Sequence, residues 1–270
     1  MVSGLFFLLT AIALAVVGPL TFWPLPSAAH FYIPIVLFIA GYLGAIIIWW
    51  VTGVIIGEIL KLKKDRKKVS KVARFFLNDP IRYVVNHALA IVKIEGKNKL
   101  PKNERFLFVQ NHTSKFDPMI MAGHFAKYDI AFITKPSNMK IPYAKHFLPT
   151  LFYQPIDRED PMQSLGVMKN SIQLIENGTT SIGVYPEGTR HRDAELGEFH
   201  EGVFNICLKA KCPLVVSVIK NANKIRTNFP FRITRVTIEI IDVIPYEQME
   251  GKTAKALSTE VREMMVEHLR

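Results

Sequence analysis

Two short polar blocks hold the residues of this chain whose types and spacing are best suited to chemistry. Residues 111–117 read NHTSKFD and place a histidine five positions before an aspartate. Residues 184–190 read VYPEGTR and end a strand-like run with a Pro-Glu-Gly turn and an arginine. A histidine oriented by a carboxylate can act as a general base, and arginine binds phosphate with two hydrogen bonds. The two blocks together suit acyl transfer onto a phosphorylated alcohol.

The pair His112 and Asp117 is also compatible with a hydrolase triad or a metal site. A triad needs a nucleophile, and Ser114 is close in sequence, but the chain has no Gly-x-Ser-x-Gly elbow. We therefore favour direct attack by a substrate hydroxyl over a covalent acyl-enzyme. A metal site is weaker still, because two ligands are too few and no His-Glu-x-x-His helix is present.

A third candidate lies between the two blocks, where residues 155–158 read PIDR. Arg158 could be a second phosphate ligand, and an ordinary surface ion pair of Asp157 with Arg158 is the alternative. The remaining histidines that we interpret as structural or simply exposed are His30, His87, His124, His146, His191 and His268. We interpret Cys207 and Cys212 as reduced, buried residues, since their spacing matches no metal motif.

Short apolar runs that alternate with helix-like segments must position these blocks. The runs that predict strands are Leu89–Ile94, Arg105–Val109, Ile130–Thr134, Phe152–Ile156, Thr180–Tyr185, Leu214–Ile219 and Val236–Val243. The alternation favours an α/β domain with a mixed, partly parallel sheet flanked by helices. Both blocks directly follow a predicted strand, and open α/β sheets build their sites at the carboxyl ends of strands.

The predicted helices of this domain are amphipathic or short. They are Val69–Ala88, Pro118–Ala126, Met162–Glu176, Gly202–Lys209 and Thr253–Leu269. We expect the first to be interrupted at Pro80 and to lie either on a membrane surface or against the core.

The first 57 residues contain no charged side chain. Two apolar runs, Leu5–Phe22 and Ile33–Ile56, are separated by a turn-like segment, Trp23–His30, so we predict an N-terminal hydrophobic helical hairpin. The cationic residues 61–68 follow directly and place that end in the cytoplasm. We therefore divide the chain into a membrane anchor, residues 1–60, and a basic α/β domain, residues 61–270. A hairpin that enters one leaflet and a cleaved signal peptide are the alternatives.

The formal net charge is +11, and all 34 basic residues lie beyond residue 60. A domain that basic attracts anions, such as lipid head groups, phosphorylated substrates or an acidic carrier protein. We exclude nucleic acid as a partner, because the sequence has no helix-turn-helix, RNA-binding aromatic signature or zinc spacing.

With these motifs in order, the chain resembles the membrane-bound glycerophospholipid acyltransferases of the lysophosphatidate acyltransferase type. The family's Asn-His-x-x-x-x-Asp block matches residues 111–117, and its aromatic-Pro-Glu-Gly-Thr-Arg block matches residues 185–190. Two weaker motifs match residues 156–158 and residues 212–216. The resemblance covers about residues 75–245. Two departures are His200, where the family often has lysine, and Cys212, where it often has valine.

The resemblance implies transfer of a fatty acyl group from acyl-CoA or an acyl carrier protein to the sn-2 hydroxyl of 1-acylglycerol-3-phosphate, giving phosphatidic acid. It implies His112 as the base and Asp117 as its orienting carboxylate. The implied substrate-binding residues are Asn111, Lys135, Arg158, Glu187, Gly188, Thr189 and Arg190. No cofactor or metal is expected, and the enzyme would be an integral protein of the cell membrane that faces the cytoplasm. The alternatives are another lysophospholipid or an amino-acid lipid as acceptor, or a non-catalytic lipid-binding protein.

Overall fold

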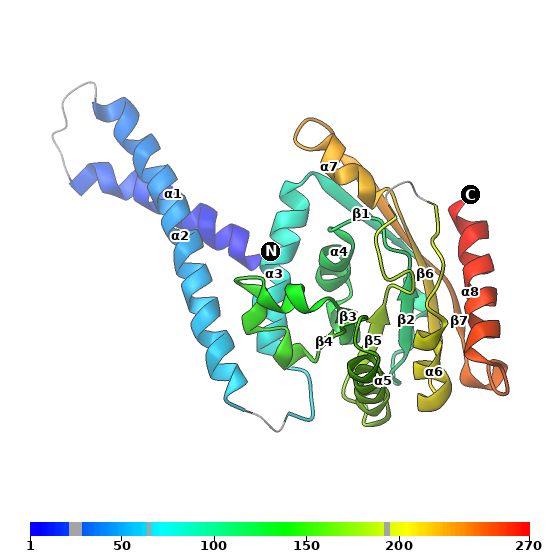
Figure 1. The fold of residues 1–270 in the computed structure, drawn as a ribbon. Helices are drawn as coiled ribbons and strands as arrows, with labels where there is room; N and C mark the ends of the chain where they lie inside the picture. The colour runs from blue at the N-terminus through cyan, green and yellow to red at the C-terminus, as the bar shows by residue number, and fades with distance from the viewer. Residues whose placement is uncertain (22–28, 64–65, 192–194) are drawn as a thin grey trace.

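The computed structural model describes residues 1–21, 29–63, 66–191 and 195–270. Two long helices at the N-terminus extend from an α/β domain that contains the rest of the described chain (Figure 1). Most of the predicted turn between the two apolar runs falls on residues 22–28, and two positions of the cationic run are residues 64–65. These positions lie outside the described residues.

Seven strands form the sheet in the described part of the chain, in the order β1-β7-β6-β2-β5-β3-β4. Their bounds are β1 Ala90–Glu95, β2 Leu107–Gln110, β3 Ile130–Thr134, β4 Gln154–Pro155, β5 Ser181–Val184, β6 Leu214–Lys220 and β7 Thr234–Ile244. Every neighbouring pair is parallel except β6 with β7. The predicted mixed, partly parallel sheet is confirmed.

Helices cover both faces of this sheet. They are α3 Lys71–His87, α4 Asp117–His124, α5 Pro161–Glu176, α6 Asn205–Ala210, α7 Ile225–Asn228 and α8 Ala254–Leu269. Leu107 and Val109 pack against α5, α6 and α8, whereas Phe106 and Phe108 pack against α3, α4 and α7. Because side chains alternate between the two faces of a strand, these four buried residues belong to the two separate cores of a three-layer domain.

The structure also contains short 3-10 helices, mostly in the connections. They are η1 Lys97–Lys99, η2 Ala126–Tyr128, η3 Pro136–Lys140, η4 Ala144–His146, η5 Pro149–Leu151, η6 Glu201–Phe204, η7 Ala222–Lys224 and η8 Tyr246–Gln248. The predicted helix Gly202–Lys209 is therefore two pieces, η6 and α6.

Helix α3 continues through Pro80, so the predicted interruption is wrong. Proline lacks the N–H that would bond to the carbonyl four residues earlier, which here is Phe76. That carbonyl instead accepts a hydrogen bond from the Tyr143 hydroxyl at 3.0 Å. The helix packs on the core through Ala73, Leu77 and other buried residues, and it leaves several apolar side chains exposed.

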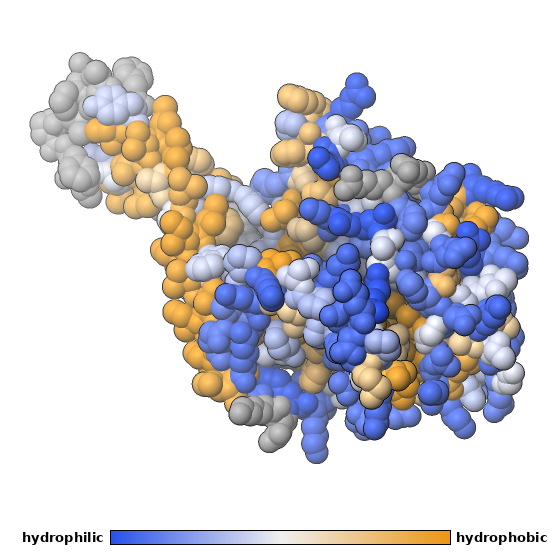
Figure 2. All heavy atoms as spheres, viewed as in Figure 1, coloured by the Kyte–Doolittle hydropathy of each residue, from blue (hydrophilic) through white to orange (hydrophobic). Residues whose placement is uncertain are grey.

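The N-terminal helices are α1 Val2–Thr21 and α2 Ala29–Lys61, which pack against each other. Both are long and apolar enough to cross a membrane. Most of their apolar side chains face outward, and Figure 2 shows this hydrophobic surface beside a largely hydrophilic domain. The predicted hairpin-like start of two hydrophobic helices is confirmed.

The hairpin is joined to the domain at several points. The backbone N–H groups of Val2 and Ser3 donate to the Asp79 carboxylate of α3 at 2.9 and 2.8 Å. On α2, the Trp49 ring packs against Phe76 of α3 with centroids 5.4 Å apart. These contacts hold α1 and α2 against the helix that covers one face of the sheet.

Candidate active site

The predicted site residues gather at one edge of the sheet. Strands β2, β3, β4, β5 and β6 run parallel to one another, so their carboxyl ends meet at this edge. The block 111–117 follows β2, the block 185–190 follows β5, and residues 156–158 follow β4. The strand ends thus bring together segments that lie up to about 75 positions apart.

His112 and Asp117 form the predicted contact. His112 Nδ1 lies 2.8 Å from Asp117 Oδ2, and the same oxygen accepts the backbone N–H groups of Thr113 at 2.6 Å and Ser114 at 2.7 Å. Asp117 is the first residue of α4 and is fully buried. Among the described residues, no protein group bonds to the other ring nitrogen, Nε2. The histidine is held in one orientation with Nε2 available to a substrate.

The ring of Tyr185 stacks on the imidazole of His112, with centroids 4.2 Å apart and planes 18° from parallel. Phe132 of β3 stacks on the other side of Tyr185 at 5.3 Å. The Tyr185 hydroxyl is buried without a hydrogen-bond partner in the described chain, and burial raises its pKa well above the ordinary value. Tyr185 therefore stays neutral and fixes the imidazole plane, a role that sequence reasoning did not assign to it.

Glu187 ties the two blocks together. One carboxylate oxygen accepts the backbone N–H of His112 at 2.6 Å, and the other accepts that of Gly197 at 2.9 Å. Burial raises the pKa of this carboxyl, against the opposing effect of its N–H donors. The backbone N–H of His191 also donates to the His112 carbonyl at 2.9 Å. Glu187 thus braces the loop of His112 and is not open to a substrate in this conformation.

Gly188 allows the close approach of a second segment. Its φ of 71° lies in the left-handed region, and a Cβ there would come within 2.7 Å of Arg158 Nη1 and 2.8 Å of His200 Cδ2. Only glycine fits this position, and the fit brings the Arg158 guanidinium onto the second block. Partial burial lowers the pKa of Arg158.

Arg190 lines a groove of about 1050 Å³ beside the dyad. The same groove is lined by residues 113–116, which directly follow His112, and by Tyr83 and Val84 of α3. His112 itself does not line the groove. Thr189 is exposed, and its hydroxyl lies 3.2 Å from His191 Nε2. The groove is large enough and apolar enough in its lining to take a lipid-like ligand.

Two other predicted substrate-binding residues lie at the same edge but do not line the groove. Asn111 is buried, and its amide pairs with the backbone of Ile219 in both directions, at 3.1 and 2.7 Å. It therefore locks the end of β2 to β6. Lys135 is exposed at the end of β3, and its ammonium makes no ion pair within the described residues.

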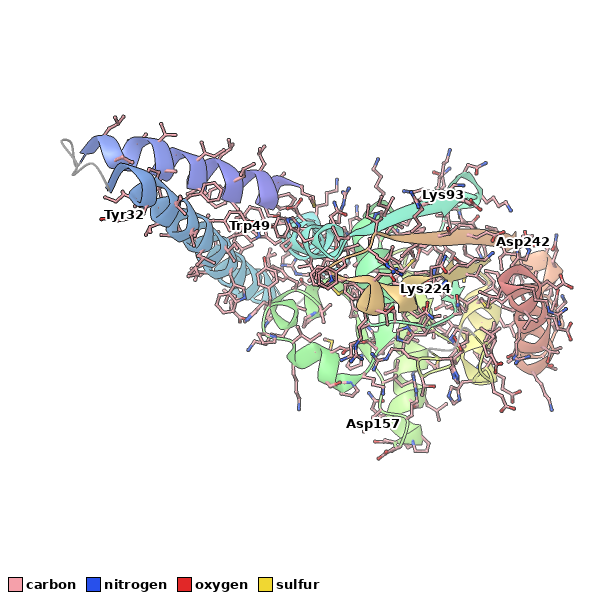
Figure 3. All side chains as sticks on the ribbon, turned by 90° about the horizontal axis from the view of Figure 1, so that it is seen from above. Tyr32, Trp49, Lys93, Asp157, Lys224 and Asp242 are labelled. Atoms are coloured by element: carbon pink, nitrogen blue, oxygen red, sulfur yellow. The ribbon has the colours of Figure 1, made fainter. Side chains whose placement is uncertain are left out.

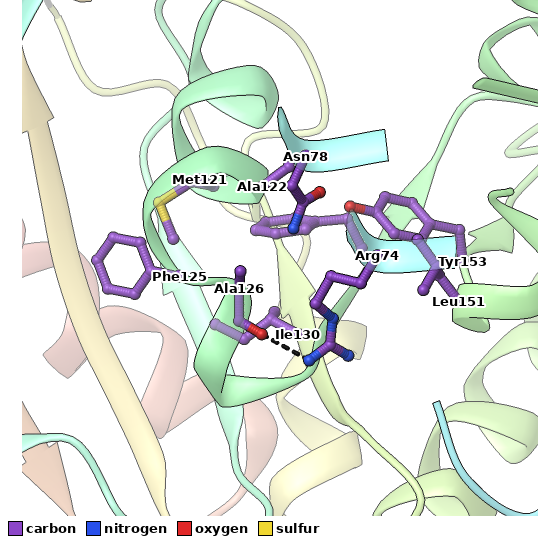
Figure 4. Close-up of a pocket in the computed structure, with 10 residues that line it drawn as sticks. Arg74, Asn78, Met121, Ala122, Phe125, Ala126, Ile130, Leu151 and Tyr153 are labelled. Atoms are coloured by element: carbon purple, nitrogen blue, oxygen red, sulfur yellow. Dashed lines mark hydrogen bonds between the residues drawn. The ribbon is translucent and has the colours of Figure 1, made fainter. Parts of the chain in front are cut away.

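A small cavity of about 20 Å³ is lined by Arg74, Tyr153 and other residues (Figure 4), and Phe132, which stacks on Tyr185, is among them. Arg74 points into it and donates to the Ala126 carbonyl at 2.5 Å, and it pairs with Asp129. Burial lowers the pKa of Arg74 to about 10. A volume this size holds one water at most, so we interpret it as part of the packing and not as a substrate site.

Within the described residues, no cluster of three or more His, Cys, Asp and Glu side chains is arranged to hold a metal ion. Cys207 and Cys212 are free and buried, as predicted. That the reaction needs no metal or cofactor stays a prediction.

Comparison with known proteins shows that the segment holding this site is similar to a known family. A family model described as Acyltransferase matches residues 91–220, which include all three segments of the site. The chain is 28% identical over 177 residues to the chloroplastic 1-acyl-sn-glycerol-3-phosphate acyltransferase BAT2 of Brassica napus, which covers 65% of this chain and 50% of that protein. It is 25% identical over 188 residues to a 1-acyl-sn-glycerol-3-phosphate acyltransferase of Borreliella burgdorferi, covering 67% and 73%.

The chain spans about half the length of the first of these curated relatives. Its fold matches the crystal structure of the 1-acyl-sn-glycerophosphate acyltransferase PlsC from Thermotoga maritima, with a TM-score of 0.60 and 22% identity over 82% of this chain and 92% of that one. The matched segment holds both polar blocks, and both curated relatives are named 1-acyl-sn-glycerol-3-phosphate acyltransferases. Through residues 91–220, this chain is similar to the acyltransferase family.

Proposed function

We propose that this protein is a 1-acyl-sn-glycerol-3-phosphate O-acyltransferase, which moves a fatty acyl group from a thioester to the sn-2 hydroxyl of lysophosphatidic acid. The hydroxyl oxygen attacks the thioester carbonyl, and the tetrahedral intermediate collapses with loss of the thiolate. The products are phosphatidic acid and a free thiol. The observation that carries the proposal is the contact of the half-buried His112 ring with the buried Asp117 carboxylate, which leaves Nε2 without a partner in the described chain.

His112 acts as the general base in this proposal. Its Nε2 removes the proton of the attacking hydroxyl and then gives that proton to the departing thiolate, so the charge balances over the cycle. The carboxylate of Asp117 stabilises the imidazolium that forms between these steps, and the Tyr185 ring keeps the imidazole in plane. General-base assistance of this kind contributes about 10²–10⁴ in rate.

Arg158 and Arg190 supply the positive charge for the acceptor's phosphate in this proposal. They follow different strands, β4 and β5, and the Arg158 guanidinium lies against Gly188, two residues before Arg190. Guanidinium groups suit a phosphate because each can donate two parallel hydrogen bonds to its oxygens. Lys135 adds a further cation at the same edge, directly after β3.

The donor is an acyl thioester of coenzyme A or of acyl carrier protein, and the basic domain suits either acidic partner. We place the enzyme in the cell membrane with its domain on the cytoplasmic side. Two apolar helices and the cationic residues that follow α2 support this placement.

The test replaces His112 with Ala in the full chain, purified in detergent. We expect acyl transfer from labelled acyl-CoA to lysophosphatidate to fall by about 10² or more while the melting temperature is kept. His268→Ala is the matched control, because His268 Nδ1 also lies 2.8 Å from a carboxylate, that of Glu239, and neither residue lines the groove. The control should stay within a few-fold of the parent.

A His112→Ala variant that keeps activity near the parent's would exclude this mechanism. A matrix of acceptors and donors on the parent, followed by mass spectrometry, identifies the substrate. If other lysophospholipids or amino-acid lipids react faster than lysophosphatidate, the acceptor in the proposal is wrong. If no acceptor reacts with either donor, the non-catalytic lipid-binding alternative replaces it.

A further inference from the structure

Residues 224–235, here called the arm, join β6 to β7 and form an exposed projection beside the groove. The arm contains four cations and no acidic residue. Its cations are Lys224, Arg226, Arg232 and Arg235, and its exposed apolar side chains are Phe229, Phe231 and Ile233. The Phe231 residue is 92% exposed, which is costly in water for an aromatic ring of this size.

The arm is anchored to the domain and ordered by its own hydrogen bonds. Ile225 is fully buried, and the Asn228 side chain donates to Thr234 Oγ1 at 3.0 Å, which closes the projection at the start of β7. The backbone N–H groups of Phe231 and Arg232 both donate to the Asn228 carbonyl. The apolar tip is therefore held away from the core. None of the four cations makes an ion pair within the described residues.

The arm lines the same groove as α3, the helix on which the hairpin packs. Lys224, Arg226, Thr227 and Phe229 of the arm line it together with Tyr83 and Val84 of α3. The first residues of α1 pack along α3, where Asn86 donates to the Met1 sulfur at 3.4 Å. Figure 2 shows hydrophobic atoms at the tip of the arm, which Figure 1 draws beyond α7. Seen from above, Lys224 lies between Trp49 of the hairpin and Asp242 at the far edge (Figure 3).

We propose that the arm docks onto an anionic phospholipid surface, with its apolar tip in the interfacial layer and its four cations on lipid phosphates. Aromatic and aliphatic side chains interleaved with Lys and Arg are the composition that binds such surfaces. The apolar hairpin, which packs on α3, provides a second membrane contact. A lipid surface in contact with both the arm and the hairpin would lie opposite the mouth of the groove, beside the loop of His112.

Charge complementarity favours lipid over a second copy of this chain. The arm is cationic throughout, and the chain carries a net charge of +11, so two arms would repel each other. The arm lines the same groove as Arg190, but the vesicle experiment measures docking without acyl transfer, so its failure is distinguishable from failure of the proposed reaction.

The test uses a fluorescent label at the arm in the full chain. Both native cysteines are buried, and burial raises the pKa of each thiol to about 12, so they react poorly with a thiol-directed dye. Phe231→Cys adds one exposed thiol without loss of packing. Glu250→Cys is the matched control, because Glu250 is exposed beyond the opposite end of β7. Each labelled protein is reconstituted into vesicles of phosphatidylglycerol with phosphatidylcholine, or of phosphatidylcholine alone.

We expect the label at position 231, and not that at 250, to shift to the blue and to be quenched by brominated lipid in the anionic vesicles. The double variant Arg226→Glu with Arg232→Glu should weaken docking at least about tenfold, since each cation at an anionic surface contributes roughly fivefold. Lys169→Glu with Lys209→Glu makes the same charge change on α5 and α6 and should leave the signal unchanged.

Three results would overturn the proposal. The first is a label at 231 that stays as exposed to water in anionic vesicles as the label at 250. The second is equal burial in phosphatidylcholine alone, which removes the role of charge. The third is a label at 231 that becomes shielded from water in detergent as the protein concentration rises. That result identifies a second copy of the chain as the occupant.

Discussion

His112 owes its orientation to residues from separate parts of the chain. Asp117 bonds to Nδ1 across five positions, whereas Tyr185 and Glu187 approach from more than 70 positions away. The contact with Asp117 could be predicted because a short turn closes it. No spacing in the sequence indicates that Glu187 bonds to the backbone of His112, or that Tyr185 covers its ring.

The raised pKa of Glu187 has a consequence for stability. Its folded-state pKa is above the ordinary 4.5, so the folded chain keeps a proton that the unfolded chain has released. The free energy of unfolding therefore falls as pH rises from 4.5 through the raised pKa, by up to about 1.4 kcal/mol per pH unit. We expect Glu187→Gln, which cannot titrate, to show a shallower fall in melting temperature over this window.

Thermal unfolding in detergent at a series of pH values measures this effect. Glu250→Gln is the control, because Glu250 is exposed, and its profile should match the parent's. If the melting temperature of Glu187→Gln falls with pH as steeply as that of the parent, another titratable group causes the fall. Only slopes are compared, since the amide also replaces one acceptor for a backbone N–H and lowers stability at every pH.

Helix α2 packs so closely on η4 that a side chain would not fit at Gly57. A Cβ at this position would lie 2.7 Å from the His146 Cβ and 3.1 Å from its carbonyl oxygen. One residue further along α2, the Glu58 carboxylate pairs with the His146 ring. The end of the second hydrophobic helix is thus fixed to a connection that leads from β3 to β4.

Gly57→Leu should separate α2 from η4 and lower stability by about 1–3 kcal/mol, the usual effect of overpacking. Gly44→Leu is the matched control on the same helix, because a Cβ there meets nothing within 4 Å. The control should be neutral or slightly stabilising, since leucine favours helix over glycine. Chemical unfolding in a fixed detergent compares the two. Equal stability of both variants would contradict the close packing.

At the scale of the molecule, the hairpin and the domain share an apolar interface. Trp49 packs on Phe75 and Phe76, and Phe7 packs on Tyr83 at 5.5 Å. The division at residue 60 stays a prediction, and the contacts indicate that the domain relies on the anchor to cover one side of α3.

Removal of residues 1–60 tests this division. We expect the remaining chain to aggregate in the absence of detergent, because the cut exposes the aromatic face of α3 as a contiguous apolar patch. Size-exclusion chromatography and thermal unfolding compare it with the full chain in the same buffers. A monomeric truncated chain that unfolds cooperatively without detergent would show that the domain is independent.

The sequence alone determined the fold class, because the alternation of short apolar runs and amphipathic segments is a local pattern that strand and helix geometry require. Each of the seven strand-like runs forms a strand in the structure, although β4 keeps only two residues. The sequence also determined the two hydrophobic helices at the N-terminus, because their prediction depends only on the length of the apolar runs and the absence of charged side chains. The predicted interruption of the helix at Pro80 is wrong, because the hydroxyl of the distant Tyr143 donates to the carbonyl that the proline leaves without a partner.

The tertiary structure alone decided which polar atoms of the motifs are bonded within the protein and which stay open. Asn111 and Glu187 lie within the motifs, yet their polar atoms bond to backbone groups of distant segments. The groove and the arm were likewise decided by packing, since α3, the loop of His112 and the connection between β6 and β7 meet only when the strands pair. Such contacts depend on strand order and register, which no local pattern of residues records.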